Sequence, residues 1–598
     1  MKPVQPPPYK NAIVALICLG AVALRFLLLH DQKLTVLGDE RYDSRLFIDL
    51  AHAISQGNWL GAYDERTLIK GPFYPLWIAS VHSLHLPLLK AQHALYVFAS
   101  ALAARAVARS LGATGALGFF LALLFDPTGF AAHTGMVLRE YVNQSLAILI
   151  VACTLLAFWN TGERKSYRVG PLLWLGIFLS CFRLTREESV WILPFYAIAA
   201  LHFCFRHARS LEKSWKSLCK NLGLVLLPFL FLAACVGAVS AINKARYGVW
   251  ETVEVKSAFF LNAYGAVSRV PPAFFKQAVP VPREFRMHLY RVSPAFRELR
   301  PFLERDNSTW TCAILELKRA YAEGKLDEGS RRSIDFILKH DAAGVWRRAW
   351  DKADKEPCDI YGAWFLWAFR EAVAQAGYYR SAVAARSYYE RLFQEIQGAC
   401  QEKKIPCGPH RASLAPPWRW DYLRPLASMF GRIIHLAVSL QGFAFDPPFS
   451  TGDAQSAVLF QQMTNEEPMP FRHDGSAPLK SWRTAFLKDI ASLYQYIFPW
   501  VFYGAFLVHL ALSLSFFKRV VGEPAWAFAS AVLGSCGALT AILSYIHVTS
   551  FPGIEPRYLA PLHSMSVIYT VLVGLSAKAL LGSQRKDQND LDPRECGC

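Results

Sequence analysis

The sequence predicts an all-α polytopic membrane protein of about ten transmembrane helices, with a large, mainly helical extracytoplasmic domain inserted between helices 7 and 8. Of the 598 residues, 53% are hydrophobic and 18% are charged, whereas roughly 25% of residues are charged in ordinary soluble proteins. Residues 221–243 and 490–516 contain no Asp, Glu, Lys or Arg, and about 20 apolar residues cross a bilayer. The long stretch between these two windows is hydrophilic.

Apolar windows along the chain give the individual spans. The first window follows a short Pro-rich start and leads to no small-residue cleavage site, so we expect a retained helix rather than a signal peptide. The predicted spans are 11–30, 91–108, 112–130, 137–158, 169–184, 189–205, 221–243, 490–516, 524–548 and 559–577. Because their number is even, both termini are expected on the same side of the membrane.

The placement of Lys and Arg predicts which side that is. With the N-terminus inside, the inner segments hold 17 Lys and Arg in 71 residues, and the short outer segments hold 10 in 91. Positive residues favour cytoplasmic loops. The expected units are therefore an N-terminal membrane module (1–243) with a first outer loop (31–90), an extracytoplasmic domain (244–489), and C-terminal spans with a cytoplasmic tail (490–598).

Inside the outer domain, helical patterns cover 308–322, 331–340 and 361–397, and Pro-rich stretches interrupt them. An uncharged stretch at 433–445 is too short for a span and indicates an interfacial or buried helix. The domain also holds four cysteines, Cys312, Cys358, Cys400 and Cys407. They are either free or paired on an oxidising side, and a Cys400–Cys407 bond would close a short loop.

The net charge of +18 does not indicate nucleic-acid binding. The positive residues are dispersed among apolar spans, and a nucleic-acid interface needs a dense basic stripe.

Charged residues gather near the outer ends of the predicted spans. Ionisable groups at membrane depth are costly and therefore indicate function, so we expect a polar cavity at the outer leaflet. The alternative is that these groups pair with one another at helix ends. They are Asp39, Glu40, Lys70, Asp126, Arg139, Glu140, Arg183, Arg186, Glu187, Glu188, Glu555 and Arg557.

The first outer loop contains the most specific motifs. It reads Gly-Asp-Glu-Arg-Tyr-Asp at 38–43 and Lys-Gly-Pro-Phe-Tyr-Pro at 70–75. These motifs resemble those of the C-type (GT-C) integral-membrane glycosyltransferases, especially the branch of aminoarabinose transferases and protein O-mannosyltransferases. Segments 135–140, 183–187 and 555–562 are similar to further segments of that family. The likeness covers most of 1–240 and 490–580 but not the insertion.

The resemblance implies a transfer of sugar from a polyprenyl phosphate to a hydroxyl group. That reaction needs a carboxylate to take the acceptor proton and cations to hold the phosphate. We expect Asp39 to be the base, with Glu40 orienting a cation or the acceptor. Lys70 would meet the phosphate, although Lys-Gly-Pro departs from the commoner Lys-Pro-Pro. Arg557 and Tyr558 match the family's Arg-Tyr and would complete the phosphate clamp; a snorkelling anchor is the alternative for Arg557.

Four further residues are candidates for substrate binding: Asp126, Arg139, Glu140 and Arg186. Asp126 or Glu140 would supply a second acid that orients the sugar or holds a divalent ion. Asp126 precedes a proline and is equally suited to a turn or helix end. No metal-ligand set is evident and no cofactor is certain, but a divalent cation is compatible with the sequence.

We therefore expect an inverting, polyprenyl-phosphate-sugar-dependent glycosyltransferase of a bacterial inner or plasma membrane, with its active site on the extracytoplasmic side. Its acceptor would be a hydroxyl of a glycan, lipid or protein. The alternative is a transporter or flippase that moves a lipid-linked or polar substrate without glycosyl transfer. A receptor whose outer domain binds a ligand is a third option, but it would leave the charges outside the insertion unexplained.

Overall fold

The computed structural model describes residues 8–159, 169–186, 188–210, 215–305, 310–326, 328–471, 482–516 and 520–589. Glu187 and the end of the predicted cytoplasmic tail lie outside these ranges. Within them the chain is helical, and its β-structure consists of isolated bridges. Seven helices are long and apolar enough to cross a membrane, and two shorter apolar helices overlap the predicted first and fifth spans. The all-α membrane fold is therefore confirmed.

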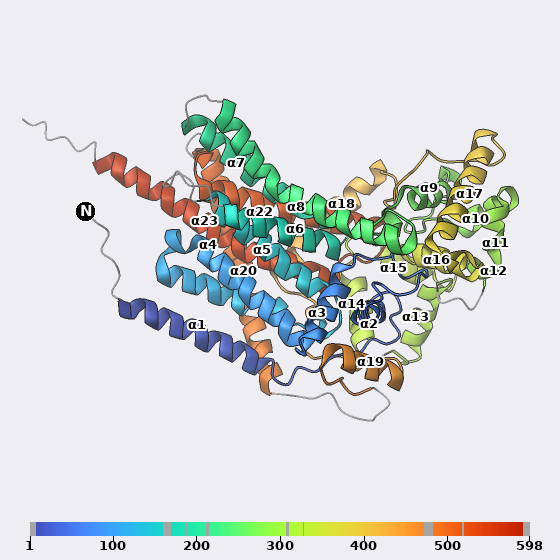
Figure 1. Ribbon diagram of the computed structural model, residues 1–598, viewed down its shortest axis with the longest axis horizontal. Helices are drawn as coiled ribbons and strands as arrows, with labels where there is room; N and C mark the ends of the chain where they lie inside the picture. Colours follow the sequence, from blue (N-terminus) through green and yellow to red (C-terminus); the bar gives the residue numbers. More distant parts are fainter. Residues whose placement is uncertain are drawn as a thin grey trace, which may run out of the picture.

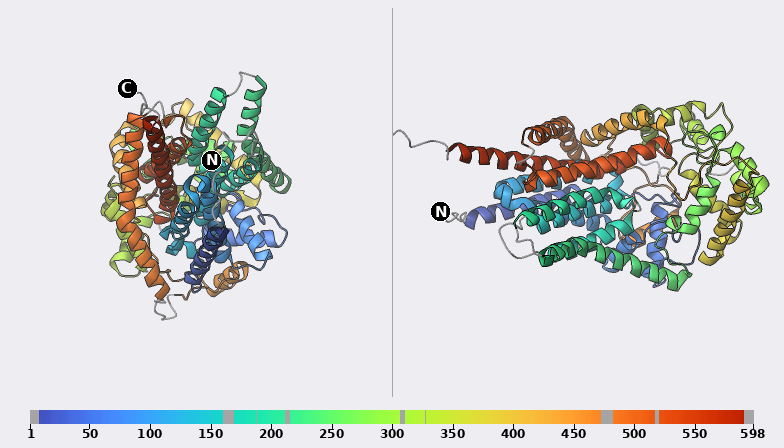
Figure 2. Two further views of the ribbon diagram at one scale, coloured as in Figure 1. Left: turned by 90° about the vertical axis from the view of Figure 1, so that its left-hand side faces the viewer. Right: turned by 90° about the horizontal axis from the view of Figure 1, so that it is seen from above.

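The membrane helices form a bundle at one end of the molecule (Figure 1). They are α1 (Pro8–Leu28), α4 (Leu88–Leu124), α5 (Glu140–Phe158), α6 (Val169–Thr185), α7 (Leu193–Ser210), α8 (Trp215–Tyr247), α20 (Trp482–Ser515), α22 (Pro524–Thr549) and α23 (Pro556–Asn589). The predicted domain boundaries at 243 and 490 fall inside α8 and α20. Figure 2 shows that α1 begins and α23 ends at the same end of the bundle, as expected for an even number of crossings.

Helix α4 is a hairpin of two helical arms. Gly112 has φ 74° and ψ 174°, a backbone conformation that glycine adopts readily. The Tyr96 hydroxyl donates to the carbonyl of Leu123 at 3.1 Å, although a straight helix would separate these residues by about 40 Å. The two arms correspond to the predicted spans 91–108 and 112–130, except that the second arm ends at Leu124, just before the Asp126-Pro127 turn.

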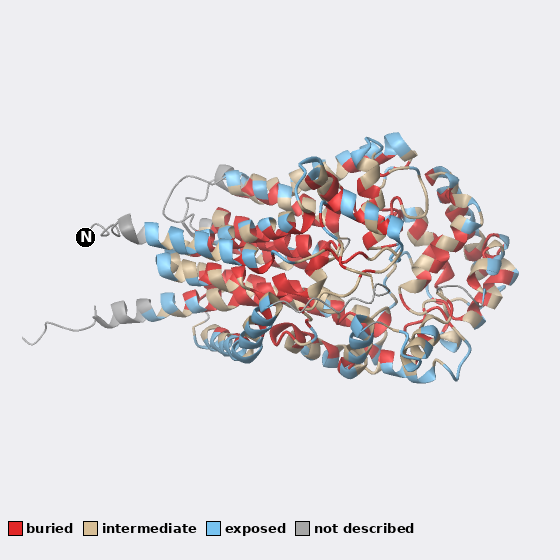
Figure 3. Cartoon of the chain, turned by 90° about the horizontal axis from the view of Figure 1, so that it is seen from below, coloured by how far each residue is buried: buried red, intermediate tan, exposed pale blue. Residues whose placement is uncertain are grey.

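Helix α5 lies at the centre of the bundle. Its most apolar window is 94% buried, compared with 11% for α8, which lies at the periphery. Figure 3 shows buried residues concentrated inside the bundle and exposed residues on its outer faces. Because a membrane helix can expose apolar side chains to lipid, the exposed outer faces of the bundle are consistent with the predicted membrane environment.

The outer domain forms the other end of the molecule, joined to the bundle through α2 (Ser44–Ser55) and α3 (Phe73–Ser83) of the first outer loop (Figure 1). Its helices are α9 (Ala258–Val267), α10 (Arg283–Val292), α11 (Pro294–Glu298), α12 (Arg300–Leu303), α13 (Ala313–Ala322), α14 (Glu328–His340), α15 (Val345–Lys352), α16 (Trp364–Gln375), α17 (Ala382–Gln401), α18 (Leu423–Val438) and α19 (Ala454–Thr464). Short 3₁₀ helices are η1 (Pro127–Phe130), η2 (Ala132–Gly135), η3 (Ser189–Ile192), η4 (Glu254–Lys256), η5 (Pro272–Phe274), η6 (Tyr378–Arg380) and η7 (Trp420–Tyr422).

Two features of this domain refine the sequence expectations. The helical pattern at 361–397 is divided into α16 and α17 because Gly377 has φ 86°, which ends the first helix. The uncharged stretch at 433–445 is the second half of α18 and the turn after it, and α18 packs against α22 and α23, so the buried alternative is correct. Disulfides join Cys312 to Cys358 and Cys400 to Cys407.

Candidate active site

The acidic motif of the first outer loop is held by segments from distant parts of the chain. The Leu34 amide donates to the Glu467 carbonyl at 2.9 Å, and the Gly38 amide donates to the Thr451 carbonyl at 2.9 Å. A Cβ at Gly38 would lie 2.8 Å from the Ser456 Cβ, so only glycine permits this close approach. The motif is therefore fixed in place although it lies in a loop.

Asp39 and Glu40 are both exposed, but their surroundings differ. Protein atoms crowd Glu40 enough that desolvation, followed by the charge of Asp43, raises its pKa to about 7, against the opposing charges of Arg557 and Lys70. The Asp39 carboxylate has no hydrogen bond or ion pair within the described part of the chain. Glu40 therefore changes its protonation near neutral pH and lies within electrostatic range of Arg557, at the opposite end of the sequence.

Lys70 forms an ion pair with Asp43. It is buried, with its ammonium group 5.1 Å from the centre of the Phe47 ring and 5.7 Å from that of Trp367. Burial would raise the pKa of Asp43, but Lys70, and then Arg557, lower it by more. The predicted phosphate ligand thus already has a carboxylate partner, and a bound phosphate would share Lys70 with Asp43.

Gly71 explains the unusual Lys-Gly-Pro motif. A Cβ at this position would lie 2.0 Å from the Leu184 carbonyl oxygen. The loop therefore passes directly against the outer end of α6, and a proline here would clash with that carbonyl. This contact brings Lys70 next to the residues that follow α6.

A second charged cluster lies at the outer ends of α5 and α6. Arg186 donates to Glu140 at 2.9 Å and to Glu188 at 2.7 Å. Arg139 donates to the Thr185 carbonyl at 2.7 Å. Burial would raise the pKa of Glu188, but Arg186 and then Arg139 lower it by more. Glu188 is therefore held as a carboxylate.

Arg557 and Tyr558, in the first turn of α23, complete this cluster. The Tyr558 ring centre lies 5.2 Å from the Arg186 guanidinium and 5.0 Å from that of Arg557, so the ring contacts both cations. The Arg557 Nε donates to Glu555 at 2.7 Å. Its two terminal nitrogens make no hydrogen bond to any residue that the structure describes, which leaves them available to a ligand.

An open hollow lies beside this second cluster, and Glu40, Asp43 and Lys70 of the first outer loop are not among its lining residues. One side is charged, and the other is an apolar face of α22 whose residues recur at helical spacing. The lining residues are Glu140, Asn143, Arg186, Glu188, Trp191, Leu539, Ile542, Leu543, Ile546, Phe551, Arg557, Tyr558 and Pro561. A charged side facing an apolar side suits an amphiphilic ligand.

Asp126 is not part of this hollow. It is fully buried, and its carboxylate accepts hydrogen bonds from the Thr128 amide and hydroxyl at 2.9 and 2.7 Å, from Ser564 at 2.5 Å and from Tyr96 at 3.3 Å. These bonds fix the turn after α4 and tie it to α23. The structure therefore favours the turn and helix-end alternative for Asp126 over a place in the substrate site.

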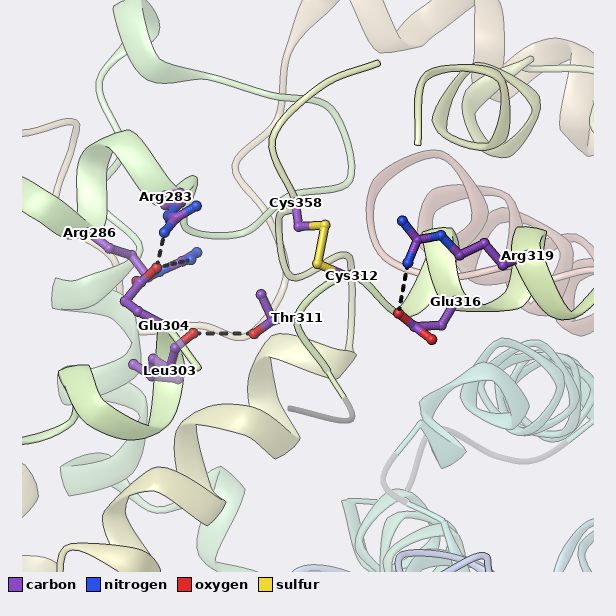
Figure 4. The surroundings of a disulfide bond; sticks show 9 residues. All are labelled: Arg283, Arg286, Leu303, Glu304, Thr311, Cys312, Glu316, Arg319 and Cys358. Carbon is purple, nitrogen blue, oxygen red and sulfur yellow. Dashed lines mark hydrogen bonds and ion pairs between the residues drawn. A yellow bond between two sulfur atoms is a disulfide. The ribbon is translucent and has the colours of Figure 1, made fainter. Parts of the chain in front are cut away.

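The outer domain contacts the acidic motif through α16. The Tyr42 ring stacks on Trp367 with ring centres 4.5 Å apart, and lies 5.8 Å from the ring of Trp310. The Trp310 indole donates to Glu371 at 2.7 Å. Trp310 lies two residues before the Cys312–Cys358 disulfide, which fixes this segment to the rest of the domain (Figure 4). The inserted domain is thus in direct contact with the loop that carries Glu40 and Asp43.

Several residues of the site were not assigned from the sequence. Asn143 follows Glu140 by one helical turn, and a polar residue at that spacing in an apolar helix was the available signal. Asp43 lies within the recognised motif. No pattern in the sequence marks Trp191 or Trp367 as part of a site. Trp367 also belongs to the insertion that the family likeness does not cover. In the described ranges no three His, Cys, Asp or Glu residues are arranged to hold a metal ion.

No family model and no curated protein matches this chain. It is similar to the solved crystal structure of ArnT from Cupriavidus metallidurans in the apo state, with 13% sequence identity over 95% of this chain and 78% of that chain. The TM-score of this match is 0.29.

Proposed function

We propose that this protein is an inverting glycosyltransferase that takes a sugar from a polyprenyl-phosphate donor and transfers it to a hydroxyl of a glycan, lipid or protein acceptor. The observation that supports the proposal most strongly is the hollow itself, because cationic groups on one side face an apolar helix on the other. A polyprenyl phosphate has both kinds of group. The apolar face of α22 would hold the prenyl chain, and the terminal nitrogens of Arg557 would hold the phosphate.

The chemistry needs a base near the acceptor. Glu40 is better suited than Asp39, because a general base works best when its pKa lies near the operating pH. Glu40 takes the proton from the acceptor hydroxyl as that oxygen bonds to the anomeric carbon. On the opposite face, the bond between this carbon and the phosphate oxygen breaks, and Arg557 and Lys70 stabilise the charge that develops on the phosphate.

The proposed location of the active site rests on the distribution of Lys and Arg that also predicts the orientation of the chain in the membrane. Helix α1 begins and α23 ends at the end of the bundle opposite the outer domain, and the Lys-rich and Arg-rich segments favour a cytoplasmic location. The hollow would therefore open to the extracytoplasmic side of a bacterial inner or plasma membrane, where the paired cysteines also fit an oxidising compartment.

The test is donor consumption by the full chain in lipid nanodiscs. A panel of polyprenyl-phosphate sugars is supplied with membrane extract as acceptor, and release of polyprenyl phosphate is measured. We expect Arg557→Ala to lower the rate about 100-fold or more. Arg391→Ala is the control, because Arg391 pairs with Glu298 on the outer domain, and it should keep the wild-type rate. Substrate movement across the membrane without donor consumption would establish the transporter alternative.

A further inference from the structure

Two carboxylates and an amide around the hollow have hydrogen-bonding capacity that the protein does not use. Within the described part of the chain, Glu140 Oε2, Glu188 Oε2 and Asn143 Oδ1 are buried and have no hydrogen-bond partner. Glu140 and Asn143 are only 7% and 4% exposed, and all three residues line the hollow. Buried polar groups are normally paired, so this side of the hollow is complete only when a ligand donates hydrogen bonds to it.

The charges around these acceptors indicate what kind of donor fits. Arg186 bonds to one oxygen of each glutamate, and Arg139 adds a second positive charge close to Glu188. Two arginines thus balance two glutamates. An ammonium group or a divalent cation would add positive charge beside two arginines, whereas neutral hydroxyl groups would satisfy the free oxygens without changing this balance.

The position of the three acceptors relative to Arg557 matches the layout of a glycosyl phosphate. The Tyr558 ring centre lies 5.2 Å from the Arg186 guanidinium and 5.0 Å from that of Arg557, so both cations are close to one ring. Glu140 and Glu188 both pair with Arg186. A phosphate at Arg557 would therefore place the attached sugar beside Glu140, Asn143 and Glu188, and the flat face of Tyr558 would lie next to it.

We propose that Glu140, Asn143 and Glu188 form the sugar subsite, and that they select a donor sugar with neutral hydroxyl groups over an amino sugar. This inference rests on the proposed function, because it assumes that the hollow binds a prenyl-linked sugar. It names the class of sugar that the proposed function leaves open.

The most direct test is Asn143→Leu, which removes the amide but keeps its size and breaks no ion pair. Asn221→Leu is the matched control, since Asn221 is another buried asparagine with an unpartnered Oδ1 but lies on α8 and outside the hollow. Binding is followed through thermal unfolding of the full chain in detergent, with three ligands: polyprenyl phosphate, a neutral hexosyl derivative of it, and an aminohexosyl derivative.

In the wild type and in Asn221→Leu, the hexosyl derivative should bind about tenfold more tightly than polyprenyl phosphate. The aminohexosyl derivative should bind no more tightly than polyprenyl phosphate. Asn143→Leu should lose the tenfold gain yet bind polyprenyl phosphate as the wild type does. Equal binding of sugar-bearing and sugar-free ligands by the wild type, or tighter binding of the amino sugar, would overturn the subsite. Failure of every polyprenyl phosphate to bind would instead count against the proposed function.

Discussion

The hollow beside Arg557 and the polar cluster around Asp126 both place carboxylates among apolar helices, but they use the carboxylate oxygens differently. Both oxygens of Asp126 accept hydrogen bonds from neighbouring side chains or backbone. Glu140 and Glu188 each have one oxygen bonded to Arg186 and one without a partner among the described residues. The comparison separates a structural carboxylate from one that is prepared for a ligand, although the sequence presents them alike.

The largest effect on activity is expected at Lys70 of the first outer loop, a proposed phosphate ligand that does not line the hollow. Lys70→Met removes a cation proposed to stabilise the leaving phosphate, so donor turnover should fall about 100-fold or more. The melting temperature in detergent should change little, because Asp43 is partly exposed to water once its partner is lost. A large loss of stability with normal turnover in the folded fraction would place Lys70 among the structural groups instead.

The Asp126 cluster should respond in the opposite way. Asp126→Ala leaves the donors of Thr128 and Ser564 without their acceptor, so the free energy of unfolding should fall by about 3 kcal/mol. Turnover per folded molecule should stay within about twofold of the wild type. Glu140→Gln, measured in parallel, should show the reverse pattern. Equal loss of stability in both variants would remove the distinction between the two regions.

The pH profile gives a sharper test of Glu40. Its pKa is raised to about 7, so the carboxylate is protonated below that pH and cannot take a proton. Turnover should therefore rise as the pH increases through about 7, and at pH 6 it should be about tenfold below the plateau. Glu40→Gln should abolish this rise together with most of the activity. Retention of the rise in Glu40→Gln, with its loss in Asp39→Asn, would return the role of base to Asp39.

The smallest effect is expected where the outer domain contacts the acidic motif. Trp367→Leu removes the ring beside Lys70 and the stacking partner of Tyr42, so turnover should fall about three- to tenfold. Trp367→Phe should restore most of it. Trp364→Leu, one turn earlier on α16, is the control for general damage to this helix. Hydrogen exchange of residues 39–46 should increase in Trp367→Leu and not in Trp364→Leu.

The sequence predicts the membrane helices well because apolar length is a local property. Even the sharp turn at Gly112 coincides with the first residue of the predicted span 112–130. The division of 361–397 was not anticipated, because a positive φ at Gly377 is not visible in a helical pattern. The site was only partly predictable for a related reason. Arg557, Glu140 and Arg186 could be found by their position at span ends, but whether an acid such as Asp126 has used all its hydrogen bonds depends on tertiary contacts.

The contact between α16 and Tyr42 constrains how the chain can be altered. Trp367 and Trp310 come from the insertion, whereas Tyr42 and Lys70 come from the first outer loop, so the two pieces form one complementary surface. A chimera that joins these membrane helices to an insertion from another chain would keep its helices and still present a mismatched loop. Insertion and loop must therefore be exchanged together, and substitutions in one are expected to be compensated by substitutions in the other over evolutionary time.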